Sequence, residues 1–416
     1  MSNIIEEMKS RLIFDENKVP LYTVPSALIT TDKKNVTTAF DWVNFQRKYI
    51  LNLFEEYMYG TIPGRPDSVV FEQLSLNDNA LDGLAIRKEV RIHFMMSNGK
   101  SHKMDLLLHM PKKAKLPVPV FLGLNFEGNA SVTCDKDILL SGNKHVSDPN
   151  PPSDRYYMPP VDESTRGDQY GRWQLKRVIQ RGYASATVYY GDIFPDSPYG
   201  FKDSIFALFH DDKELEKKDK AFGAIGAWAC GLSRAMDYIE SDPSLDSHQV
   251  IVHGHSRLGK AALWAAANDL RFASVISNNS GCAGAAFKRR CFGENIEWLS
   301  YWRPYWFHHN YQKFSRNEGK LPVDQHMLIS LLAPRPVYVA SAEDDPNADP
   351  KGEFLSLVYA APVYKLFGSN GINTDIMPEV NTPVHADLGY HIRSGHHDLT
   401  EVDWKYFLDF TDKYFR

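Results

Sequence analysis

A serine lies at a sharp turn between an apolar strand and a helix in the middle of the chain. The segment GHSRLGK at 254–260 follows the apolar residues 250–253 and precedes a stretch rich in Ala and Leu. A strained turn of this kind exposes the serine hydroxyl, and the helix N-terminus presents free N–H groups to a developing oxyanion. The pattern predicts that Ser256 is a nucleophile that forms an acyl-enzyme, although Leu258 stands where such turns usually have a second glycine. A serine that only caps the helix is the alternative.

A base for this serine is expected in a loop after the last strand. The segment SGHHD at 394–398 lies there, just before a C-terminal helical pattern. Of its two histidines we predict His397 as the general base. His396 is the alternative, and otherwise it would make a supporting hydrogen bond or be a buried imidazole. We expect Asp398 to be the N-cap of the C-terminal helix.

The acid that orients the imidazole is expected after the next-to-last strand. The apolar run 335–342 ends in Glu343-Asp344-Asp345-Pro346, and a carboxylate here completes the chain order Ser, Asp, His. We predict Asp345, because the strand continues past the apolar run until Pro346 enforces a turn. A solvated run of carboxylates is the alternative.

The other histidines do not have the spacing of metal ligands. His308 and His309 are adjacent in an aromatic-rich stretch, so they cannot both face one ion from a helix. The sequence therefore predicts serine-based hydrolysis without a metal ion or a cofactor.

Short apolar runs alternate with helical patterns along the chain. Continuous apolar runs, typical of strands buried on both faces, occupy residues 118–126, 183–190, 250–256 and 335–342. Apolar residues recur with helical spacing over residues 39–58, 221–239, 257–268 and 398–415. Residues 86–96 and 103–110 flank an Asn-Gly turn, the strongest short-range signal of an antiparallel hairpin.

Strands that alternate with helices predict a mostly parallel sheet covered on both faces. We expect an α/β protein with the three-layer αβα sandwich of the α/β-hydrolase fold and an antiparallel N-terminal strand pair. Residues 1–416 are expected to form a single domain, with an N-terminal helical extension over about residues 1–65. Residues 126–172, rich in Pro, Asn, Asp and Gly, are expected to form a long active-site loop.

The composition excludes several other classes of protein. The 47 basic and 52 acidic residues give a formal net charge of −5, without the clustered Lys and Arg that a nucleic-acid binder needs. No stretch approaches the roughly 20 apolar residues of a membrane helix, and the N-terminus lacks the pattern of a signal peptide. We expect neither nucleic acid nor a membrane as partner. The compartment stays open, because a signal peptide could have been removed, and so does the oligomeric state.

The four cysteines are too few for a disulfide framework, and none falls in a C-x-x-C pattern. We expect free buried thiols at Cys134, Cys230, Cys282 and Cys291. Only Cys282 and Cys291 are close enough in sequence to suggest a bridge, which is the alternative.

These motifs resemble those of bacterial glucuronoyl esterases, carbohydrate esterase family 15, from about residue 40 to the end of the chain. The specific part is G-x-S-R-x-G-K at 254–260, which accounts for the late glycine. The other matching strings are NNSG at 278–281, GAA at 284–286, FGE at 292–294, WF at 306–307, EDD at 343–345, ADP at 348–350 and HDL at 397–399. The resemblance implies a serine esterase with Ser256 as nucleophile and His397 as base.

The resemblance also assigns residues that hold the substrate. It implies that Arg257 contacts the oxyanion and the carboxyl group, and that Lys260 donates to the hydroxyls of a uronate. Glu294 and Trp306 would line the sugar pocket. Arg257 and Lys260 would supply fixed positive charge where an oxyanion and a polar sugar are held.

The chain departs from the family pattern at two positions. Many members carry the catalytic acid as a glutamate where this sequence has Asn279, so the acid must come from Asp345. Related sequences often place a sugar-stacking tryptophan where this one has Asn347.

The function expected from these features is hydrolysis of esters of glucuronic acid, as in lignin–carbohydrate linkages of the plant cell wall or in methyl glucuronate esters. The substrate would be a carbohydrate ester of the glucuronoxylan type. An acetyl xylan or other carbohydrate deacetylase with the same triad is the alternative enzyme. A catalytically inactive carbohydrate-binding protein is the alternative of another class, and the complete triad argues against it.

Overall fold

The structure is a computed structural model that describes residues 2–141 and 161–416. Nine strands of this described chain form one sheet, in the order β1-β2-β3-β5-β4-β6-β7-β8-β9. The strands are β1 (Ser68–Asn79), β2 (Ala85–Met95), β3 (Ser101–Pro111), β4 (Val118–Asn125), β5 (Ala184–Tyr189), β6 (Leu245–His255), β7 (Ser274–Asn278), β8 (Val337–Ala342) and β9 (Leu388–Arg393). The four apolar runs of the sequence are confirmed as β4, β5, β6 and β8.

One side of the sheet is antiparallel and the rest is parallel. The predicted hairpin is confirmed as β2 and β3, whose register runs from Ala85 opposite Pro111 to Met95 opposite Ser101. The preceding strand β1 also pairs antiparallel with β2, so three antiparallel strands come first in the chain. From β5 to β9 all neighbouring strands are parallel. Parallel strands end at the same edge, and the loops that follow them therefore meet there.

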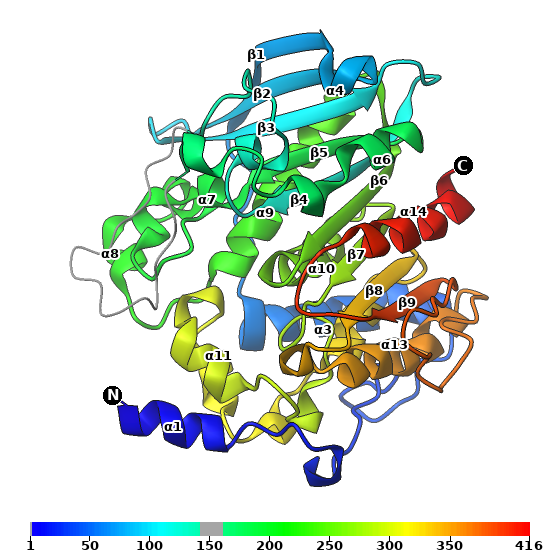
Figure 1. The fold of residues 1–416 in the computed structure, drawn as a ribbon. Helices are drawn as coiled ribbons and strands as arrows, with labels where there is room; N and C mark the ends of the chain where they lie inside the picture. The colour runs from blue at the N-terminus through cyan, green and yellow to red at the C-terminus, as the bar shows by residue number, and fades with distance from the viewer. Residues whose placement is uncertain (1, 142–160) are drawn as a thin grey trace.

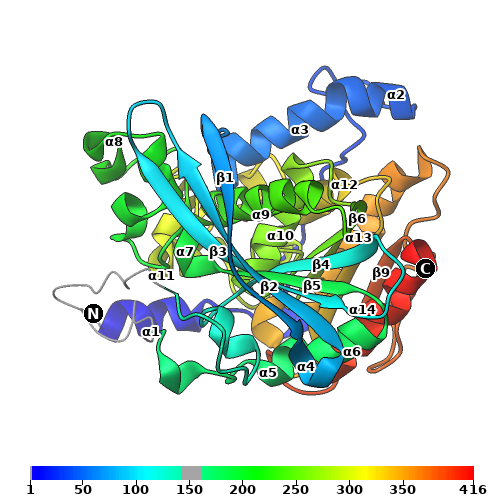
Figure 2. The ribbon, with the colours of Figure 1, turned by 90° about the horizontal axis from the view of Figure 1, so that it is seen from above.

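Helices cover both faces of the sheet (Figure 1). Seen from above in Figure 2, α3, α9, α10 and α12 lie on one side of the strands, and α6 and α14 lie on the other. The longer helices are α1 (Ser2–Ser10), α3 (Arg47–Phe54), α6 (Leu175–Gln180), α9 (Ala224–Ser241), α10 (Arg257–Asn268), α11 (Ile296–Trp302), α12 (Gln325–Ser330), α13 (Pro350–Lys365) and α14 (Glu401–Phe415). The shorter ones are α2 (Ala39–Asp41), α4 (Ala80–Gly83), α5 (Tyr170–Trp173), α7 (Tyr190–Ile193) and α8 (Asp212–Glu216).

Each face of the sheet has its own apolar core. On the side of α9 and α10 the fully buried side chains include Trp228 and Trp264. On the side of α14, Trp404 packs edge-on against Phe121 of β4, with ring centroids 5.4 Å apart. Burial of large apolar side chains on both faces explains why the central strands have continuous apolar sequences. The three-layer α/β-hydrolase sandwich is confirmed.

The helical predictions are confirmed with shifted ends. The helix after Ser256 has the predicted bounds. The segment predicted over 39–58 is continuous helix from Ala39 to Tyr59, with π-helical turns at Trp42–Gln46 and Glu55–Tyr59 on either side of α3. The C-terminal helix begins at Glu401, so the predicted Asp398 N-cap is wrong. Thr400 is the N-cap, and its hydroxyl and the Asp403 carboxylate form a reciprocal capping box.

The cysteines are all free thiols, so the alternative bridge between Cys282 and Cys291 is not formed. Cys230 and Cys282 are buried as expected. The expectation of burial is wrong for Cys134, which is exposed, and Cys291 is only partly buried.

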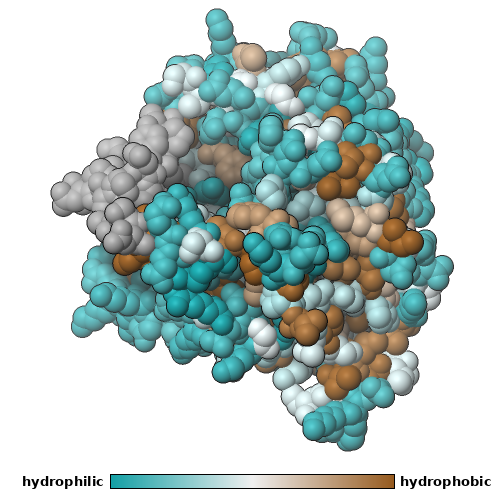
Figure 3. Space-filling model, turned by 60° about the horizontal axis from the view of Figure 1, so that its bottom comes forward, coloured by the Kyte–Doolittle hydropathy of each residue, from teal (hydrophilic) through white to brown (hydrophobic). Residues whose placement is uncertain are grey.

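The surface seen in Figure 3 is mostly hydrophilic, and its apolar side chains form separate patches between polar ones. Among the described residues, no helix is both long and apolar enough to span a membrane. The predicted loop 126–172 includes short helical turns on both sides of residues 142–160, which lie outside the described part.

Candidate active site

Ser256 occupies a strained turn between β6 and α10. Its backbone has φ 56° and ψ −127°, a conformation that residues with a Cβ rarely adopt. A Cβ at Gly254 would lie 2.1 Å from the carbonyl oxygen of Leu258, so only glycine fits there. A Cβ at Gly259 would lie 3.1 Å from Cβ of Ser280, which shows that α10 approaches the segment after β7 at position 259. Leu258, which stands where the second glycine of such turns is usual, is buried in the core, and the close approach instead falls at Gly259.

His397 and Asp345 come from the loops after β9 and β8, which are neighbouring strands. Nδ1 of His397 lies 2.6 Å from Oδ2 of Asp345, in a geometry for an Nδ1–H donor and a carboxylate acceptor. Burial raises the pKa of Asp345. The hydrogen bond and the charge of His397 lower it by more than burial raises it, so the net pKa is below its ordinary value. The neighbouring His396 is 86% exposed and lies 3.8 Å from Asp344. The arrangement therefore leaves Nε2 of His397 for a proton transfer.

Asn279 and His255 support this pair. The Asn279 amide donates to Oδ2 of Asp345 at 3.0 Å, and Asn279 has φ 45° directly after β7. The ring of His255 lies 4.6 Å from the ring of His397. Burial lowers the pKa of His255 well below its ordinary value, so this ring is neutral beside His397.

Arg257 is held by a buried carboxylate that the sequence did not predict. Asp196 forms an ion pair with Arg257 and accepts hydrogen bonds from Nε1 of Trp306 at 2.7 Å and from the Tyr305 hydroxyl at 2.8 Å. The guanidinium lies 5.1 Å above the ring of Trp306. Asp196 thus joins two of the predicted site residues and fixes their relative position.

Lys260 is buried one helical turn below Ser256. Its Nζ donates to the carbonyl oxygen of Ser280 at 2.6 Å. Burial lowers its pKa below the ordinary value, and Glu294 opposes this effect. Glu294 is positioned by its own backbone N–H, which donates to the carbonyl oxygen of Asn347 at 3.0 Å. The two departures from the family pattern, Asn279 and Asn347, therefore both lie at the site.

All of the predicted site residues line one cavity of about 470 Å³. It is lined by Ser256, Arg257, Lys260, Asn279, Glu294, Trp306, Asp345, Asn347 and His397, together with Trp298, Leu299, Trp302 and Arg303. The sequence analysis missed Trp298 and Trp302. Their spacing of four residues was a signal, because it places both aromatic side chains on one side of α11.

Glu353 lies beneath the cavity and has no exposed surface. Its carboxyl group accepts from the backbone N–H of Gly281 at 2.9 Å and contacts the hydroxyl groups of Ser280 and Ser341. Burial raises its pKa to about 8. A mostly neutral Glu353 therefore anchors the segment after β7 that faces the substrate cavity.

The described residues contain no group of three or more His, Cys, Asp or Glu side chains that could bind a metal ion. The chemistry available in the cavity is that of a serine hydroxyl, an imidazole with a carboxylate partner, and fixed cations.

A parallel sheet with helices on both faces and a serine at the turn after β6 define an α/β-hydrolase. The family described as "Glucuronyl esterase, fungi" matches residues 202–368. Carbohydrate esterase MZ0003, from an unknown prokaryotic organism, is 43% identical over 96% of this chain and 91% of the relative. A solved glucuronoyl esterase from Solibacter usitatus is 43% identical over 96% of this chain and 99% of that one, with a TM-score of 0.88.

A solved CE15 esterase from a marine bacterial metagenome is 42% identical over 96% of this chain and 99% of that one, with a TM-score of 0.86. The chain belongs to carbohydrate esterase family 15, the glucuronoyl esterases, and is a carboxylic ester hydrolase. The resemblance seen in the sequence is thereby confirmed.

Proposed function

We propose that this protein hydrolyses esters of glucuronic acid through an acyl-enzyme on Ser256. The observation that carries the assignment is the shared cavity, in which Ser256 and the His397–Asp345 pair lie beside buried Lys260 and beside Glu294. A charged and polar acyl pocket suits a uronate, because the sugar of a glucuronoyl ester is on the acyl side of the scissile bond.

The chemistry follows from these groups. Nε2 of His397 takes the proton of the Ser256 hydroxyl as its oxygen attacks the ester carbonyl. Asp345 holds the imidazole and stabilises the imidazolium that forms. The oxyanion of the tetrahedral intermediate is stabilised by Arg257 and by the N–H groups at the start of α10. His397 then protonates the leaving alcohol. In the second half of the reaction His397 takes a proton from water as the water oxygen attacks the acyl carbonyl, and it returns the proton to Ser256 as the serine leaves.

Substrate recognition is assigned to Lys260, Glu294 and Trp306, which line the same cavity as Ser256. Lys260 donates one hydrogen bond to Ser280, and an ammonium group has two further N–H donors for sugar hydroxyls. Glu294 offers an acceptor, and Trp306 offers an aromatic face that Asp196 holds in place. The polymer that carries the ester would be of the glucuronoxylan type.

The names of the relatives agree with this assignment. The Solibacter usitatus protein is a glucuronoyl esterase, and the marine metagenome protein is a promiscuous CE15 esterase. We further propose that residues 1–416 form a single domain, which is supported by a sheet with strands from Ser68 to Arg393.

The test compares turnover of benzyl glucuronate with that of 4-nitrophenyl acetate. A glucuronoyl esterase has a much higher kcat/KM for benzyl glucuronate, because only this substrate fills the polar acyl pocket. A higher kcat/KM for the acetate ester would reject the proposal in favour of a deacetylase. Absence of turnover for both esters would indicate an inactive carbohydrate-binding protein.

A further inference from the structure

The loop that carries His397 is held by one buried arginine. Arg393, at the end of β9, donates from Nη1 to the carbonyl oxygen of Ser394 at 3.0 Å. Its Nη2 donates to the carbonyl oxygens of His396 at 3.0 Å and Asp398 at 2.6 Å. The last two residues flank His397 in the chain. The guanidinium therefore fixes the backbone on both sides of the base, as its planar set of donors allows.

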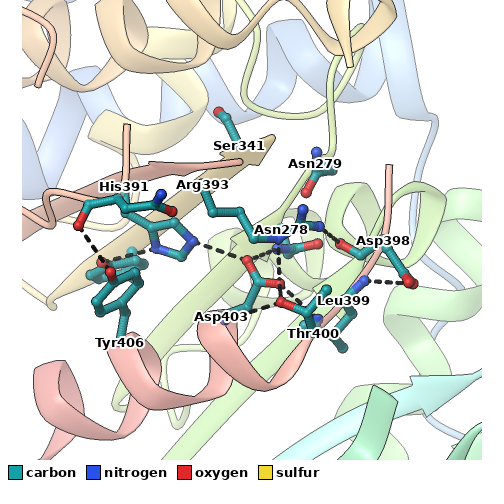
Figure 4. Close-up of polar contacts among 12 residues, drawn as sticks. Asn278, Asn279, Ser341, His391, Arg393, Asp398, Leu399, Thr400, Asp403 and Tyr406 are labelled. Carbon is teal, nitrogen blue, oxygen red and sulfur yellow. Dashed lines mark hydrogen bonds and ion pairs between the residues drawn. The ribbon is translucent and has the colours of Figure 1, made fainter. Parts of the chain in front are cut away.

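Asp403 holds this arginine in turn. It lies in the first turn of α14 with no exposed surface. Its Oδ2 accepts from Nε of Arg393 at 2.8 Å and from the backbone N–H and hydroxyl of Thr400, each at 2.7 Å. Figure 4 shows Arg393 between Asp403 and the chain around Asp398. Burial raises the pKa of Asp403, but the hydrogen bond from His391 and the charges of His391 and Arg393 lower it, so the carboxyl group is ionised.

A second path leads from Asp403 to the ring of His397. Oδ1 of Asp403 accepts from Nδ2 of Asn278 at 3.1 Å and from Nε2 of His391 at 2.9 Å. The Asn278 amide is thereby oriented with its oxygen 2.6 Å from Nδ1 of His255. His255 is the ring that packs against His397 at 4.6 Å. One buried carboxylate thus orients both the loop that carries the base and the ring beside it.

We propose that Arg393 and Asp403 are positioning residues for the general base His397. The inference rests on the proposed function of His397. Neither Arg393 nor Asp403 is among the residues that line the active-site cavity, so they act through the loop and through His255. A short hydrogen bond such as that between His397 and Asp345 depends on orientation, and small displacements of catalytic groups are costly.

The test replaces Arg393 and compares it with a matched arginine. Arg393→Lys keeps the positive charge, but one ammonium group on a flexible stem cannot reach three carbonyl oxygens and Asp403 together. The control is Arg335→Lys. Arg335 lies just before the start of β8, whereas Arg393 lies at the end of the parallel strand β9, so the two arginines are at opposite ends of the strands. Arg335 donates to the carbonyl oxygens of Ala266 at 2.6 Å, Phe272 at 2.9 Å and Asp269 at 3.2 Å.

We expect Arg393→Lys to lower kcat for benzyl glucuronate roughly 10- to 100-fold, with KM changed by less than about threefold. Arg335→Lys should leave kcat within about threefold of that of the original protein, measured at a temperature below the melting temperatures of both variants. The low-field proton signal of the hydrogen bond between His397 and Asp345, observed by NMR, should shift or broaden only in Arg393→Lys. Asp403→Asn should lower kcat in the same way, because it removes the charge that holds Arg393.

Equal kcat values for Arg393→Lys and Arg335→Lys, with the NMR signal unchanged, would overturn the positioning role. The proposal is also withdrawn if Arg393→Lys and Asp403→Asn both fail to fold while Arg335→Lys folds, because the cluster then serves folding alone. Failure of the proposed function is distinguishable, because the original protein itself would then turn over benzyl glucuronate no better than 4-nitrophenyl acetate, or His397→Ala would keep the full activity of the original protein.

Discussion

The side-chain amide of Asn279 donates to the oxygen of Asp345 that also lies 2.6 Å from Nδ1 of His397. The family resemblance of the sequence implies a glutamate where this chain has Asn279. A neutral amide at this place supports the carboxylate instead of competing with it for the imidazole. The negative charge that orients His397 therefore comes from Asp345.

Asp345→Ala should lower kcat by about 10²- to 10⁴-fold, because the imidazolium loses its charged partner and its orientation. Adding Asn279→Glu to this variant should recover part of the loss by supplying a carboxylate from the end of β7. Steady-state kinetics with benzyl glucuronate measure both effects. If Asp345→Ala alone keeps nearly full kcat, Asp345 is not the acid of the triad.

Ser256→Ala should lower kcat by roughly 10⁴-fold or more while the fold is kept, because the acyl-enzyme cannot form. Ser280 lines the same cavity but its hydroxyl contacts Ser277 and the backbone N–H of Ala285. Ser280→Ala is therefore the matched variant, and its loss should be far smaller. Residual activity of Ser256→Ala within about tenfold of the original would contradict the nucleophile assignment.

Lys260→Met should reduce kcat/KM for benzyl glucuronate. The expected loss corresponds to a rise of about 1–3 kcal/mol in the activation free energy, which is the cost of a lost hydrogen bond from a charged group. Methionine keeps most of the buried volume, so that packing changes little. Turnover of 4-nitrophenyl acetate should hardly change, since an acetyl group does not reach Lys260. Equal losses on the two esters would count against recognition of the uronate by Lys260.

Glu353→Gln should remove a pH dependence of folding stability. The folded-state pKa of Glu353 is about 8, above the ordinary value of 4.5, so the folded protein binds a proton that the unfolded chain releases between these pH values. Stability from this group is complete below pH 4.5 and is lost as the pH rises toward about 8, by at most about 1.4 kcal/mol per pH unit.

Urea unfolding at several pH values measures this effect. The difference in the free energy of unfolding between the original protein and Glu353→Gln should fall as the pH rises from 5 to 8. A difference that stays constant over this range would show that Glu353 is ionised in the folded protein.

The elements that could be predicted from the sequence are those whose side chains are buried along the whole element. Strands buried on both faces have continuous apolar sequences, and α10 has an unbroken buried pattern. The strand β1 was not predicted because it lies at the edge of the sheet, where exposed and partly buried residues do not alternate cleanly. The Thr400 cap could have been found, since Thr400 and Asp403 have the spacing of a capping box.

The candidate site divides in the same way. Ser256, Asp345 and His397 could be predicted because each follows a recognisable strand at the same edge of the sheet. Their supporting residues could not. Asp196 meets Arg257 across 61 positions of the chain, and Asn278 meets Asp403 across 125. No local pattern marks such pairs, because only the packing of distant elements brings them together.

The backbone conformation of Ser256, with φ 56°, is one that glycine adopts without strain. Ser256→Gly would remove the proposed nucleophile and the strain together, whereas Ser256→Ala keeps the strain. The glycine variant should therefore melt at a higher temperature than the alanine variant, and calorimetry can compare them. The inactive glycine protein would then be the more durable of the two. Under the proposed function, a copy of this protein released from selection for ester hydrolysis would become more stable by exchanging Ser256 for glycine.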